Sequence, residues 1–227
     1  MSTTTRSQSR SPVSPAVAVG LTVALFGISL LWPLDVPDRL ADSTAGSMLV
    51  GSLTNWLVVG VLLAVVLYWE RRRLASIGLE TPDRRQTLVA LGAGVGAVVL
   101  ALLVTGLAVA AFDLEQPETL STIEELSLPV KLVVVGTAVV TEELLWRGYP
   151  IERLTELTGT VWVGAATSAV VFLAVHAPAW GVVGAIPQAV FTLVLVGVYV
   201  WSRNVVACML THGVVNAVML LLLPAVL

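Results

Sequence analysis

Long apolar runs, separated by short polar connections, dominate this chain of 227 residues. The runs are about 20 residues long, which is the length that an α-helix needs to cross a bilayer. They do not alternate with a period of two, as the strands of a membrane barrel do. Because only helices or closed barrels satisfy their backbone groups within lipid, the pattern predicts an all-α, polytopic transmembrane helical bundle.

Seven spans are predicted, and the fourth differs from the others because charged residues interrupt it. The predicted spans cover residues 16–32, 48–69, 87–112, a fourth from about 130, then 161–176, 182–201 and 205–226. Pro129 marks the start of the fourth span, and Pro150 predicts a kink or a break in it. Beyond Pro150 the helix is expected to continue as an amphipathic segment to a turn at Gly159.

The chain divides into three predicted parts. Residues 1–15 are rich in Ser, Thr and Arg and are expected to form a disordered tail. Residues 16–73 hold two N-terminal spans, and residues 74–227 hold the core of the bundle. Arg6 and Arg10 precede the first apolar run as in a signal peptide, but no small-residue cleavage pattern follows at residues 33–38. This favours a retained first span.

Composition agrees with a membrane protein. Hydrophobic residues make up 57% of the chain and charged residues 12%, against about 25% charged in a soluble domain, and the mean hydropathy is +0.93. A net charge of −3 gives no nucleic-acid footprint. The single cysteine, Cys208, excludes an internal disulfide framework and a cysteine metal cluster.

Basic residues gather on one side of the predicted bundle. With seven spans and the N-terminus inside, ten of the twelve Lys and Arg residues fall on the inner side, as the positive-inside rule requires. The acidic connections at residues 35–42 and 113–125 then fall outside. The chain is predicted to be a multi-pass protein of the cell membrane with its N-terminus inside.

Two adjacent carboxylates and an arginine interrupt the fourth span. Glu142, Glu143 and Arg147 follow an apolar run, and each charge costs about 2.5–3.5 kcal/mol on insertion scales. Charges at that depth indicate a functional site that faces the bundle interior. Glu143 and Arg147 are four residues apart and can pair on one helix face. Glu142 points about 100° away, so it is not engaged by that pair.

The two histidines of the chain, His176 and His212, also lie in apolar runs. Phe172 lies one turn before His176, and Asn216 lies one turn after His212. Glu142 precedes Gly159 by 17 residues and His176 follows it by 17. The two therefore lie level in a hairpin, each about 25 Å from the turn, if the helix continues past Pro150.

We therefore expect Glu142, His176, His212 and Asn216 to converge within the membrane. Glu142 could act as general base toward a water that His176 orients, while His212 and Asn216 stabilise an oxyanion. Glu142, His176 and His212 are also a common zinc ligand set with one position open to water. Structural interhelical hydrogen bonds and a proton-coupled transporter are the alternatives.

The motifs resemble those of the CPBP intramembrane proteases, which include the type II CAAX prenyl endopeptidases and the abortive-infection or bacteriocin-immunity proteins. The matching residues are Glu142-Glu143-x-x-x-Arg147, Phe172-x-x-x-His176 and His212-x-x-x-Asn216. The segment Leu74 to Leu79 resembles a loop found upstream in this family, so the likeness covers residues 74–227.

The resemblance implies an intramembrane endopeptidase that cleaves a membrane-associated or lipidated protein or peptide. Glu142 and His176 would activate the water, His212 and Asn216 would stabilise the oxyanion, and Glu143 and Arg147 would support the site. The family has been described as metal-dependent and as metal-free, so a divalent metal such as zinc stays open. A non-catalytic immunity or scaffold protein of the same fold is the alternative. We expect substrate to enter a cavity among spans four to seven, from the inner side or laterally.

Overall fold

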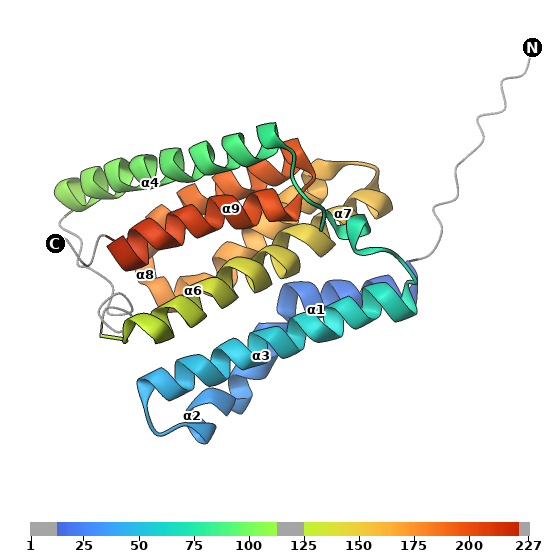
Figure 1. The fold of residues 1–227 in the computed structure, drawn as a ribbon, viewed down its shortest axis with the longest axis horizontal. Coiled ribbons are helices and arrows are strands. Elements are labelled where there is room, and N and C mark those ends of the chain that lie inside the picture. The colour runs from blue at the N-terminus through green and yellow to red at the C-terminus, as the bar shows by residue number, and fades with distance from the viewer. Residues whose placement is uncertain (1–12, 113–124, 223–227) are drawn as a thin grey trace, which may run out of the picture.

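The computed structural model describes residues 13–112 and 125–222, and every regular element in those two segments is helical (Figure 1). This confirms the predicted all-α class. The predicted tail lies outside the described residues except for residues 13–15, and so do most of the acidic connection at residues 113–125 and the end of the last predicted span.

Three helices form the N-terminal part of the fold. They are α1 (Pro15–Leu31), the short α2 (Val36–Leu40) and α3 (Thr44–Ala64). A π-helical segment, Val65–Trp69, extends α3, and a 3-10 turn, Leu74–Ile77, leads to the long helix α4 (Arg84–Phe112). α1, α2 and α3 lie together at one edge of the molecule (Figure 1).

The remaining helices contain all the charged and histidine motifs. They are α6 (Leu128–Glu142), a π-helical segment (Glu143–Gly148), α7 (Tyr149–Thr158), α8 (Val161–Ser202) and α9 (Val205–Asn216), which Ala217–Leu222 extends as a π-helix. α6 lies between α3 and α9, and α4 packs against α8 and α9 (Figure 1).

Five helical segments of the described chain are long and apolar enough to cross a membrane. They are Thr44–Trp69, Arg84–Phe112, Val161–Pro178, Val183–Ser202 and Val205–Leu222, which match the second, third, fifth, sixth and seventh predicted spans. The first and fourth are present as α1 and α6, but these helices are shorter, with 17 and 15 residues. The count of seven and the orientation of the N-terminus stay predictions.

α8 contains two spans joined at a break. Gly181 has a positive φ of 60° and lies between Pro178 and Pro187, which removes regular helical geometry at that point. A residue with a side chain rarely adopts such a backbone, so glycine suits this position. The break separates the segment that carries His176 from the following span.

The helix that contains Glu142 continues past Pro150, as the level placement of Glu142 and His176 requires. No break occurs, because the π-helical segment Glu143–Gly148 widens the helix just before the proline. Pro150 has no N–H to offer the carbonyl of Trp146, four residues earlier. That carbonyl accepts a hydrogen bond from the Ser168 hydroxyl of α8 instead. The predicted turn follows at Gly159, with φ +78°.

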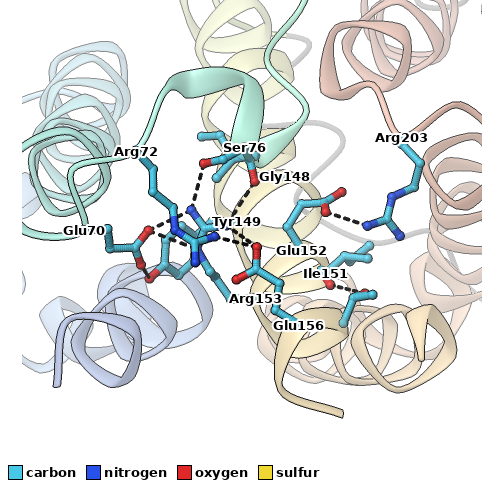
Figure 2. Close-up of polar contacts among 12 residues, drawn as sticks. Glu70, Arg72, Ser76, Gly148, Tyr149, Ile151, Glu152, Arg153, Glu156 and Arg203 are labelled. Atoms are coloured by element: carbon cyan, nitrogen blue, oxygen red, sulfur yellow. Dashed lines mark hydrogen bonds and ion pairs between the residues drawn. The ribbon is translucent and has the colours of Figure 1, made fainter. Parts of the chain in front are cut away.

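A buried polar network, which we call the Arg153 network, joins α7 to the N-terminal helices (Figure 2). The guanidinium of Arg153 is fully buried and donates to Glu70 over 2.7 Å and 3.0 Å and to the carbonyl and hydroxyl oxygens of Ser76. The Tyr149 hydroxyl donates to the same Glu70 over 2.6 Å. Because Glu70 follows α3, these bonds fix α7 against the N-terminal part of the fold.

Further ion pairs surround this network near the ends of the helices. Arg203 donates to Glu152 over 2.5 Å (Figure 2). The Tyr199 hydroxyl donates to the same carboxylate over 2.8 Å. Arg72 pairs with Glu156 over 2.5 Å. That hydrogen bond raises the pKa of Arg72 above its ordinary value, so the guanidinium stays charged.

We predict that Gly20→Ala lowers stability. A Cβ at residue 20 would overlap the ring and hydroxyl of Tyr149, which the bond to Glu70 holds in place. Overpacking of this kind costs about 1–3 kcal/mol, so the Tm in detergent should fall. The matched control is Gly60→Ala on α3, where an added Cβ meets no atom within 4 Å. Equal Tm values for the two variants would contradict this packing.

Candidate active site

Glu142 and His176 face each other between α6 and α8. Glu142 Oε1 lies 3.9 Å from His176 Nε2, and the two side chains are 17% and 18% exposed. His176 Nδ1 lies 2.8 Å from the Phe172 carbonyl oxygen, to which a protonated Nδ1 donates. In the neutral ring this leaves a lone pair on Nε2, directed toward Glu142. The two groups are too far apart for a direct hydrogen bond, and a water placed beside them can contact both.

His212 is held by Glu143 on one side and Asn216 on the other. Its Nδ1 lies 2.8 Å from Glu143 Oε1, and the Asn216 amide nitrogen lies 3.0 Å from its Nε2. Arg147 donates to the same Glu143 oxygen over 3.2 Å, as the spacing predicts. The side chains of Glu143 and Arg147 are fully buried.

These contacts change one expectation from the sequence. Glu142 was expected to meet His176, His212 and Asn216, while Glu143 and Arg147 pair with each other on one helix face. The hydrogen bonds of the described residues attach His212 to Glu143, which therefore joins Arg147 to the His212–Asn216 pair. The physical reason is that Glu143 begins the π-helical segment and projects toward α9, whereas Glu142 ends α6 and projects toward α8.

Aromatic rings fix the orientation of His176. The Phe172 ring lies 4.1 Å from the His176 ring, and Trp146 contacts both rings at centroid distances of 5.0 Å and 5.3 Å. The Arg147 guanidinium lies 4.1 Å from the Phe172 centroid, within cation–π range. Phe172 therefore contacts both His176, which faces Glu142, and Arg147, which pairs with Glu143. Trp146 was missed in the sequence, although it lies one turn after Glu142 and could have been found by that spacing.

Several buried polar atoms around the site have no hydrogen-bond partner among the described residues. They are Glu143 Oε2, Trp146 Nε1, Arg147 Nε and Arg147 Nη2. Buried polar atoms are nearly always paired in proteins, and exceptions gather where function requires them. Their position beside Glu142 and His176 agrees with a functional role for this region.

A cavity of about 700 Å³ opens onto the Glu142–His176 pair. Trp146 also lines it, whereas His212 and Asn216 are not among the lining residues. Its size lies within the range of about 300–1,000 Å³ that is typical of small-ligand sites. Glu142 and His176 are therefore the site groups that a molecule in this cavity would contact first.

The zinc ligand set is not assembled in this geometry. Within the two described segments, no group of three or more His, Cys, Asp and Glu side chains is arranged to hold a metal ion. Both ring nitrogens of His212 are engaged, by Glu143 and by Asn216. A ligand nitrogen must present its lone pair to the metal, so His212 does not fit that role here.

Fold and site together define a multi-pass helical membrane protein with a carboxylate–histidine pair inside the bundle. Residues 124–218 match the family model of the type II CAAX prenyl endopeptidases, described as Rce1-like. This confirms the resemblance for that segment, which spans α6 to α9. No curated protein and no solved structure matches the chain significantly.

We predict that Glu143→Gln and Glu142→Gln differ in stability although the residues are adjacent. Glu143→Gln leaves the buried Arg147 without its counter-charge, a change that costs about 3–5 kcal/mol. Glu142 is partly exposed and lies 3.9 Å from His176, so Glu142→Gln should unfold close to the wild-type temperature. Thermal unfolding in detergent micelles measures both. The reverse order of stability would contradict the assignment of the buried ion pair.

Proposed function

We propose that this protein is an intramembrane endopeptidase that hydrolyses a peptide bond of a membrane-associated protein or peptide in the cell membrane. The observation that carries the proposal is the Glu142–His176 pair at the wall of a cavity, inside a segment that matches the Rce1-like endopeptidases. A general base must lie within reach of the proton it removes. Glu142 meets this condition for a water between it and His176.

In the proposed reaction, the His176 Nε2 lone pair accepts a hydrogen bond from the water and orients it. Glu142 accepts a proton from that water while the water oxygen forms a bond to the carbonyl carbon of the substrate. The carbonyl oxygen becomes an oxyanion. When the tetrahedral intermediate collapses, the C–N bond breaks and the proton on Glu142 passes to the leaving amine. Glu142 is then a carboxylate again, so protons and charge balance.

His212 and Asn216 form the second half of the proposed site. The Asn216 amide nitrogen carries two hydrogens, and one of them points at His212 Nε2. The other is available to an oxyanion, an interaction worth about 10²–10³-fold in rate. Glu143, held by Arg147, orients His212 and through it Asn216. Glu143 and Arg147 thus act as positioning residues.

We predict that Glu142→Gln and His176→Ala abolish cleavage while the fold is kept. General acid–base catalysis contributes about 10²–10⁴-fold, and a glutamine accepts no proton from water. Proteomics of membranes that carry the wild-type or the Glu142→Gln protein would identify the substrate, and the rate of its cleavage would be measured for each variant.

The matched control is Cys208→Ala, which removes a buried thiol that bonds a backbone carbonyl and should leave cleavage unchanged. Asn216→Ala should lower kcat with a smaller change in KM, because an oxyanion forms after substrate binding. Full activity of Glu142→Gln would overturn the proposed function. It would favour the non-catalytic immunity or scaffold alternative.

We predict that cleavage survives treatment with a divalent-metal chelator. The basis is the donor geometry, in which His212 is engaged at both ring nitrogens by Glu143 and Asn216. Activity is measured before and after dialysis against the chelator, with metal content determined in parallel. Loss of activity that zinc restores would support the zinc site of Glu142, His176 and His212 instead.

A further inference from the structure

The N-terminal helices supply most of the wall of the cavity that leads to Glu142 and His176. α1, α2, α3 and their connections contribute the greater part of the lining residues, and α6, the π-helical segment Glu143–Gly148 and α8 contribute the rest. The family match begins at residue 124, so most of the residues that line the cavity lie outside it. The matched domain holds the reacting groups, and the unmatched helices hold the binding surface.

We infer that the N-terminal helices form a binding groove for a basic polypeptide segment, which enters from the end of the bundle that carries α2. This inference rests on the proposed function. It differs from the expected entry among spans four to seven, because the observed cavity lies between the N-terminal helices and α6 and α8.

The cavity runs from an exposed rim to the partly buried Glu142–His176 pair. At the rim lie Asp38, Asp42 and Thr44, which are all exposed, and at the inner end lie Glu142 and His176. The wall formed by α3 extends from Thr44 to Asn55, a rise of about 17 Å along a helix. That length accommodates about five residues of extended polypeptide.

The opposite end of the bundle is closed. All residues of the π-helical segment Glu143–Gly148 are buried, and the Arg153 network fills the space between α7 and the end of α3 (Figure 2). The guanidinium of Arg153 and the ring of Tyr149 are both fully buried there. A substrate segment therefore reaches Glu142 past α2, and not past α7.

The negative charge of the cavity lining favours a positively charged ligand. The lining includes the carboxylates Asp38, Asp42 and Glu142, and among the described residues no Lys or Arg lines the cavity. Carboxylates around a narrow site of low dielectric raise the local concentration of cations. Side chains such as Ser43, Ser47, Ser52 and Asn55 offer hydrogen bonds to an extended backbone along the same path. A polypeptide segment with Lys or Arg side chains fits both features.

Binding to the Glu142→Gln protein tests this inference independently of cleavage. The probes are two fluorescein-labelled peptides with the same apolar ten-residue segment, one ending in three lysines and the other in three glutamates. Fluorescence anisotropy in detergent should show about tenfold tighter binding of the lysine peptide. Adding Asp38→Asn and Asp42→Asn, both at exposed positions, should reduce that preference to about twofold, because both rim carboxylates are then neutral.

A bulky thiol reagent tests the route of entry. Ser47→Cys places a thiol in the cavity wall, and Thr81→Cys places one on the exposed connection before α4, at the other end of the bundle, both in a Cys208→Ala background. Modification at residue 47 should weaken binding of the lysine peptide at least about tenfold, and modification at residue 81 should leave it unchanged. In proteoliposomes, the reagent should block binding of the lysine peptide only when it is applied from the side of the membrane on which α2 lies.

Equal binding of the two peptides, binding of neither peptide, or no block at residue 47 would each overturn the inference. The proposed function is judged separately, by cleavage of the identified substrate in the wild type and in Glu142→Gln. If Glu142→Gln is inactive while modification at residue 47 leaves both binding and cleavage intact, the endopeptidase stands and the groove does not. If the groove binds the lysine peptide as described and Glu142→Gln still cleaves the substrate, the groove stands and the endopeptidase proposal with Glu142 as the base does not.

Discussion

A fully buried ion pair between Glu143 and Arg147 sets the arrangement of the helices that carry the site. An uncompensated charge at membrane depth is so unfavourable that the surrounding helices must supply partners for it. Glu143 is bonded by Arg147 from its own helix and by His212 from α9. The Arg147 guanidinium in turn lies against the Phe172 ring of α8. One pair thus joins three helices and places His212 and Phe172 at fixed distances from Glu142.

The same constraint acts a second time within α7, at Arg153. Arg153 is buried as deeply as Arg147, but its carboxylate partner comes from the end of α3 and not from the same helix. The Glu70–Arg153 ion pair therefore joins the N-terminal helices to the segment that matches the family, and separating the two parts would leave both charges without a partner. This explains how helices outside the family match keep a defined position beside Glu142 and form one side of its cavity.

Features that depend on local spacing could be predicted from the sequence, and features that depend on which helices pack side by side could not. The all-α class, the turn at Gly159, the level placement of Glu142 and His176 and the Glu143–Arg147 pair all follow from counting residues along regular helices. The partner of His212 does not, because it depends on how α9 packs beside Glu143 and not on spacing along one helix. The Glu70–Arg153 pair joins residues 83 positions apart, and no local pattern signals it.

The hydrogen bond between Ser168 and the Trp146 carbonyl has a consequence for how two helices slide along each other. Pro150 has no N–H to donate to the Trp146 carbonyl, and the Ser168 hydroxyl of α8 donates a hydrogen bond to that carbonyl. Ser168 lies two turns before His176 on the same face of α8, and Trp146 lies one turn after Glu142. The bond therefore fixes the position of α8 along the helix that carries Glu142. A shift of α8 by one turn would lose this bond and would also move His176 away from Glu142, so the proline that disturbs one helix fixes the height of the other.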